Sequence, residues 1–176
     1  MKQLNKTRIM VLSAMFLAIA FVLPFLTGQV PQIGAMLCPM HLPVILCGFV
    51  CGSPWGFMVG LLSPILRSLI LGMPPMFPKA ICMAMELAVY GAVSGFLYHT
   101  LPKKKSNIYA ALIMAMIAGR VVWGLSMVLC MGIMGESFGW KAFMFGAVTN
   151  AVPGIILQIV LIPLLVMGVE QIKIRS

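Results

Sequence analysis

The sequence contains few charged residues and almost no acids. Only 9% of its 176 residues are charged, and its 3 acidic residues are all glutamates. Soluble domains carry about 25% charged residues and are about half apolar, whereas 62% of this chain is hydrophobic. Its apolar runs are continuous, unlike the alternating runs of a membrane β-barrel. The composition therefore predicts an all-α integral membrane protein, with room for about six spans of roughly 20 residues.

Signatures of enzymes and metal sites are also missing. The sequence has no H-E-x-x-H, G-x-S-x-G or Walker A phosphate loop, and its 2 histidines lie far apart. The 5 cysteines form no C-x-x-C pair and mostly fall in apolar segments, which favours small buried side chains over metal ligands or disulfides. We therefore expect no enzyme, no metal and no cofactor.

The net charge of +9 has a membrane explanation. Most basic residues stand at the ends of apolar runs, which is the positive-inside pattern and not a groove that follows phosphates, so we expect no nucleic-acid partner. The N-terminal apolar run is long, lacks a cleavage site and is followed by more spans, so we expect a retained helix within a lipid bilayer. The terminal basic residues are Lys2, Lys6, Arg8, Lys103, Lys104, Lys105, Lys173 and Arg175.

Apolar runs and breaking residues predict six helices in one transmembrane domain, residues 1–176. The second is short for a span, and prolines should kink the sixth. The lysines place both termini and the 103–105 loop in the cytoplasm, so the loops 27–40, 72–78 and 132–141 lie outside. The expected helices run from about 8 to 26, 41 to 52, 55 to 71, 78 to 99, 108 to 131 and 142 to 169.

Four polar residues interrupt these helices, one in each of four different helices. They are Arg67, Glu86, Arg120 and Asn150. Gly56, Gly60 and Ser63 share the helical face of Arg67 and should turn it inward. On the predicted topology all four residues converge on the outer half of the bundle.

Burying two arginines and one glutamate in a membrane requires compensation. One interpretation is a purely structural ion pair between Glu86 and either Arg67 or Arg120. That pair leaves one positive charge over, which favours a site for an anionic or strongly polar solute, held by Arg120 or Arg67.

Three further side chains are candidates for this site. Tyr90 and Trp123 would supply aromatic walls. His41 is either a polar residue at the membrane interface or a ligand at the outer mouth of the site. The substrate-binding candidates are thus His41, Arg67, Glu86, Tyr90, Arg120, Trp123 and Asn150.

The hairpin around Arg67 resembles a known family. Its run HLPV at 41–44, then GSPWG at 52–56 and VG at 59–60, is similar to the substrate-binding S components of energy-coupling factor (ECF) transporters. The resemblance implies six helices with cytoplasmic termini in a bacterial cell membrane. It also implies capture of a vitamin-like solute outside, for example a carboxylate such as pantothenate, and docking on a transmembrane T subunit that binds two ATPases.

Ala14 and Ala18 lie four residues apart on the first helix. By spacing alone they slightly favour an internal packing face, whereas the resemblance implies the A-x-x-x-A face that docks on the T subunit. An alternative function is a stand-alone carrier of a small polar solute, coupled to protons through Glu86. Against it, the two halves show no evident inverted repeat.

Overall fold

The computed structural model describes residues 5–27, 36–102, 104–136, 139–149 and 151–175. All regular elements in these ranges are helical, which confirms the all-α prediction. In chain order they are α1 (Lys6–Val22), η1 (Leu23–Thr27), α3 (His41–Cys51), α4 (Ser53–Leu71), η2 (Met76–Ala80), α5 (Ile81–Thr100), α6 (Lys105–Ile133), α7 (Trp140–Met144), η3 (Phe145–Thr149) and α8 (Val152–Arg175).

Among the described residues, five helical stretches are long and apolar enough to cross a membrane. The second predicted helix corresponds to α3, which has 11 residues and is buried along most of its length. Two glycines end helices in this part of the chain, because each adopts a positive φ that other residues avoid. Gly52 (φ 96°) separates α3 from α4, and Gly72 (φ 69°) ends α4 with its N–H bonded to the Ser68 carbonyl.

The last predicted helix, 142–169, differs from the structure. We expected one helix kinked at Pro153, whereas the described residues form α7, the π-helical turn η3 and then α8, which begins at Val152. Pro153 thus lies in the first turn of α8. Backbone N–H groups there have no partner within the helix, so a proline costs no helical hydrogen bond. Pro163 lies inside α8, as expected.

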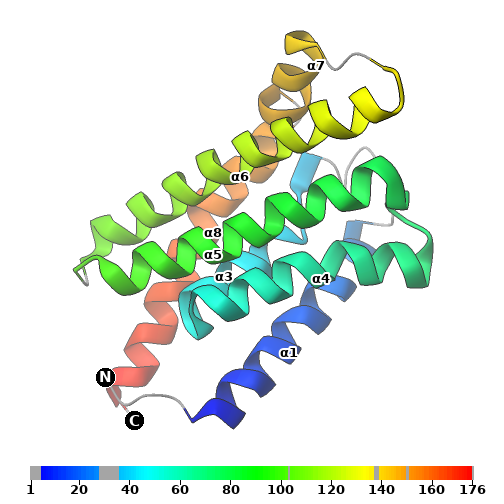
Figure 1. Ribbon diagram of the computed structural model, residues 1–176. Coiled ribbons are helices and arrows are strands. Elements are labelled where there is room, and N and C mark those ends of the chain that lie inside the picture. Colours follow the sequence, from blue (N-terminus) through cyan, green and yellow to red (C-terminus); the bar gives the residue numbers. More distant parts are fainter. Residues whose placement is uncertain (1–4, 28–35, 103, 137–138, 150, 176) are drawn as a thin grey trace.

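Helix α5 lies at the centre of the bundle, between α4 and α6 and against α3 (Figure 1). Glycines bring these helices close together. A Cβ on Gly91 of α5 would meet the backbone of Gly56 on α4, and one on Gly60 would meet the backbone of Leu87. The predicted inward face of α4 is confirmed, since Gly56, Gly60, Ser63 and Arg67 are all buried.

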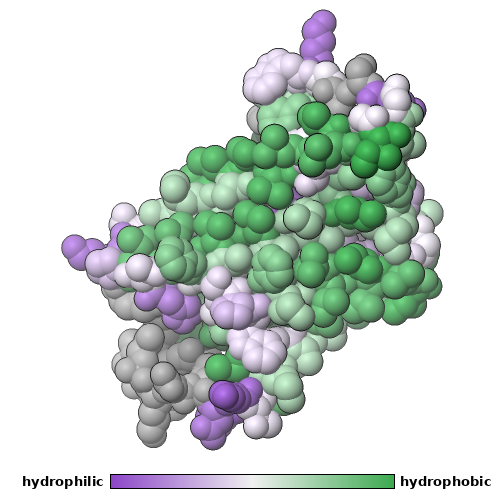
Figure 2. All heavy atoms as spheres, viewed as in Figure 1, coloured by the Kyte–Doolittle hydropathy of each residue, from purple (hydrophilic) through white to green (hydrophobic). Residues whose placement is uncertain are grey.

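The outside of the bundle is broadly apolar. Figure 2 shows hydrophobic residues over the length of the helices, with polar residues gathered toward the ends of the molecule. Large apolar side chains are exposed, among them Leu69 (68%), Leu129 (68%) and Ile133 (79%). In water such a surface would be unfavourable, whereas in a bilayer it faces lipid. The chain is therefore a multi-pass membrane protein.

The first turn of α1 and the end of α8 lie at the same end of the bundle as the α5–α6 turn (Figure 1). This agrees with an even number of crossings. That this end is cytoplasmic remains a prediction from the lysines.

Candidate functional site

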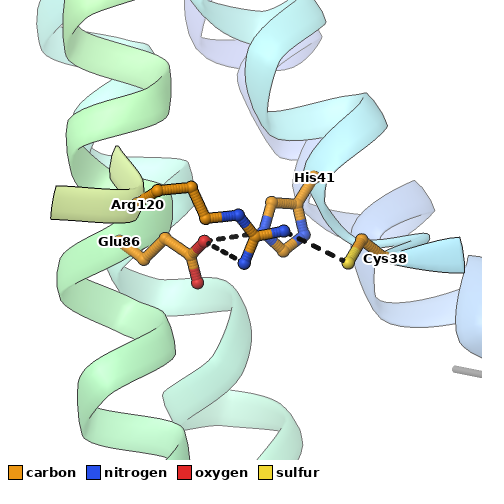
Figure 3. A network of polar contacts seen from close by, with 4 residues as sticks. All are labelled: Cys38, His41, Glu86 and Arg120. Carbon is orange, nitrogen blue, oxygen red and sulfur yellow. Dashed lines mark hydrogen bonds and ion pairs between the residues drawn. The ribbon is translucent and has the colours of Figure 1, made fainter. Parts of the chain in front are cut away.

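A buried ion pair joins the two central helices. Glu86 lies on the inner face of α5 and is 2% exposed, and Arg120 reaches it from α6, with 2.9 Å between Arg120 Nη1 and Glu86 Oε1 (Figure 3). Beside this pair the ring of Tyr90 on α5 packs on Gly119 of α6, where a Cβ would lie 2.7 Å from the ring. Gly119, the residue before Arg120, thus leaves room for this ring.

His41 brings a third helix to this pair. It is the first residue of α3, is 3% exposed, and places Nε2 3.5 Å from Glu86 Oε1. Its ring also meets Tyr90 edge-on, with 5.1 Å between ring centroids. A separation of 3.5 Å is long for a hydrogen bond, so this contact is weaker than the one from Arg120. His41 is thus part of the buried cluster. That it binds a solute there stays a prediction.

Cys38 is a neighbour of the cluster that the sequence did not indicate. Its Sγ lies 3.8 Å from Arg120 Nη2, so the guanidinium lies between a carboxylate and a thiol (Figure 3). Burial raises the pKa of the Cys38 thiol, and the nearby Arg120 charge opposes that rise only in part. The thiol therefore stays neutral. The sequence offered one signal for including Cys38 in the cluster, which is its position three residues before His41 in a proline-containing loop.

The cluster keeps unused hydrogen-bonding capacity. Within the described residues, Arg120 Nε and His41 Nδ1 are buried and have no hydrogen-bond partner. Each such atom costs about 1–3 kcal/mol when it is left unsatisfied. Sites that bind a ligand carry such a cost, since the ligand supplies the missing partners.

Arg67 is buried but serves a different contact. Its Nη1 donates a hydrogen bond to the Phe21 carbonyl (2.8 Å), and its guanidinium lies 5.1 Å from the centre of the Phe25 ring. Phe21 is in the last turn of α1, where carbonyls lack helical partners and a cation is favourable. The glutamate is thus paired with Arg120, and the contacts of Arg67 hold α4 against α1 and η1.

The other predicted residues lie at different distances from the pair. Tyr90 is fully buried against His41 and Gly119. Trp123, almost one turn beyond Arg120 on α6, faces the α7 and η3 segment, with its ring 6.2 Å from that of Phe143 and packed on Gly146. Asn150 lies outside the described residues.

The two alanines of α1 are on its exposed face. Ser13 and Ala20 form the buried face, and the Cys47 thiol of α3 approaches Ser13 Oγ at 3.8 Å. Ala14 and Ala18 are exposed. Packing inside the bundle therefore uses the neighbouring face of α1, which contains Ser13 and Ala20, and the A-x-x-x-A face is exposed.

The described residues contain no group of three or more His, Cys, Asp or Glu side chains placed to hold a metal ion. The chemistry that the cluster offers is hydrogen bonding and charge, in a buried setting where both are strong.

Comparison with known proteins gives one match. A family model described as "ECF transporter, substrate-specific component" matches residues 8–166. Searches of curated proteins and of solved structures find no match to the chain.

Proposed function

The chain belongs to the substrate-specific components of ECF transporters, and we propose that it captures a small, polar, vitamin-like solute at the cluster of Glu86, Arg120 and His41. This family consists of transporter components that bind substrate and is not a class of enzymes. We place the site on the outer side of a bacterial plasma membrane. The whole chain then acts as one transmembrane substrate-binding domain.

The observation that carries this proposal is the buried cluster with unused hydrogen-bonding atoms. A purely structural ion pair gains most when all its donors and acceptors are satisfied. Here Arg120 Nε and His41 Nδ1 lack partners among the described residues, on side chains that already meet Glu86. Tyr90 forms one wall of the site, and Trp123 would extend it along α6. Asn150 lies outside the described residues and stays a candidate from the sequence.

Import would follow by docking on a transmembrane T subunit bound to two ATPases. The exposed Ala14 and Ala18 support this step, because small residues let a second helix approach closely. A chain without a phosphate-binding motif also needs an outside source of energy.

Titration of the purified chain with a panel of vitamins and their precursors tests capture, with thermal stabilisation as the readout. A compound that binds the folded protein should raise its melting temperature, because it stabilises the protein by an amount that grows with the logarithm of one plus the ratio of ligand concentration to Kd. A folded protein that responds to no vitamin, nucleobase or precursor would contradict the proposal.

Uptake into vesicles separates this mechanism from the alternative carrier. We expect no uptake by the chain alone, with or without a proton gradient, and ATP-dependent uptake when a T subunit and ATPases are present. Uptake by the chain alone that follows a proton gradient would instead support coupling through Glu86.

A further inference from the structure

Gln158, in the first half of α8, is a buried amide whose hydrogen-bonding capacity is not fully used by the described residues. It is 1% exposed, and its Oε1 has no hydrogen-bond partner among the described residues. A carbonyl oxygen removed from water in this way is unfavourable unless a donor reaches it. Nothing in the apolar pattern of α8 requires a glutamine here, since its neighbours on the same face are Gly154 and Ile162.

The face of α8 that carries Gln158 packs against the segment that leads into the cluster. One turn earlier, Gly154 lies on the segment before α3, where a Cβ would be 2.7 Å from the Met36 carbonyl oxygen and 2.9 Å from that of Leu37. One turn later, Ile162 joins the core that α3 helps to form. Gln158 lies one turn after Gly154 on the same buried face of α8, and α8 packs against α3, which begins at His41.

With His41 uncharged, the charges of the side chains in the cluster sum to zero. Glu86 and Arg120 neutralise each other at 2.9 Å. Arg67, the other arginine of α4–α6, contacts the Phe21 carbonyl and the Phe25 ring instead, where α4 packs on α1 and η1. An anionic solute would add an uncompensated negative charge to this buried space, which is strongly unfavourable.

The unmatched atoms describe a complementary ligand. Arg120 Nε–H is a donor, Gln158 Oε1 is an acceptor, and a neutral His41 offers one of each. We propose that the site binds an uncharged solute with a hydrogen-bond donor and acceptor close together, such as an amide or a nitrogen heterocycle, and that Gln158 determines this specificity. This inference rests on the proposed function, and it gives the substrate class as neutral where the count of arginines alone had favoured an anion.

Matched pairs of compounds test the charge of the ligand. The full-length protein in nanodiscs is titrated calorimetrically with nicotinamide and nicotinate, panthenol and pantothenate, and biotinamide and biotin. We expect at least one uncharged member to bind, and to bind about tenfold or more tightly than its carboxylate partner. A carboxylate that binds more tightly than its partner overturns the inference and leaves the proposed function standing. Binding by no member of any pair contradicts the proposed function itself.

Variants of Gln158 test its role with the uncharged compound that binds best. Gln158→Met keeps the shape and removes the acceptor, so affinity should fall about tenfold. Ile156→Met, at a position that is 57% exposed on the same helix, should leave affinity unchanged. Gln158→Glu keeps an acceptor oxygen and should discriminate further against carboxylates, which keeps the test open if the first variant folds poorly. Unchanged affinity in Gln158→Met would remove Gln158 from the site.

Discussion

At the scale of single residues, the two arginines inside the bundle have different surroundings. Arg120 meets the carboxylate of Glu86 and retains an unpaired N–H among the described residues. Arg67 donates to a backbone carbonyl at the end of α1 and stacks near Phe25. We therefore propose different roles for the two arginines, with Arg120 in solute binding and Arg67 in stability.

Replacing Arg120 with alanine should weaken solute binding while the protein still inserts and folds. Hydrogen bonds that involve a charged group contribute about 1.5–3 kcal/mol, which corresponds to a loss of affinity of about 10- to 150-fold. Isothermal titration of the variant with the bound solute measures this loss. An unchanged Kd would exclude Arg120 from the site.

Replacing Arg67 with methionine should have the opposite effect. The variant keeps much of the apolar volume and loses the bond to the Phe21 carbonyl, so we expect a loss of stability of about 1–3 kcal/mol and an unchanged Kd. Thermal unfolding in detergent and the same titration measure the two quantities. A Kd that rises as much as in Arg120→Ala, at unchanged stability, would place Arg67 in the site.

At the scale of helices, we expect the buried and exposed faces of α1 to have separate uses. Ala14→Trp adds bulk on the exposed face, so solute binding should persist while ATP-driven uptake with the T subunit and ATPases is lost. Ala20→Trp is the matched control, because Ala20 is 0% exposed and its enlargement should disturb folding. Loss of folding in Ala14→Trp would indicate that this face packs within the chain.

The crossing of α4 and α5 depends on glycine. A Cβ on Gly91 would meet the Gly56 backbone, so Gly91→Ala should destabilise the protein by about 1–3 kcal/mol through overpacking. Gly132→Ala is the control, because no atom lies within 4 Å of a Cβ there. Melting temperatures of the two variants compare these effects. Equal stability would mean that the helices can separate without cost.

At the scale of the whole molecule, the sequence predicted the helices well and the partners of the polar residues less well. Continuous apolar runs and breaking residues determined most helix limits, and the small residues beside Arg67 indicated which way it faces. Spacing within one helix does not say which side chain of another helix it meets, so Glu86 had two equal candidates. The packing of Tyr90 on Gly119, like the pairing of Arg120 with Glu86, is a tertiary contact between α5 and α6.

The features that the sequence missed are also tertiary. Cys38 looks like an ordinary buried cysteine in the sequence, and only the fold shows that its loop brings it to Arg120. Gln158 likewise stands out only once its buried, unpartnered oxygen among the described residues is seen. The break before α8 was expected as a kink, because a proline in an apolar run fits both a kinked helix and the start of a new one.

The most direct test of the central claim is mass spectrometry of small molecules that co-purify with the protein. If Glu86 and Arg120 form the binding site, we expect one small polar solute in the wild-type preparation, at about one molecule per chain. We expect none in a folded Arg120→Ala preparation. Equal amounts of the same solute in both preparations, or no solute in a folded wild-type protein, would contradict a binding site at Glu86 and Arg120.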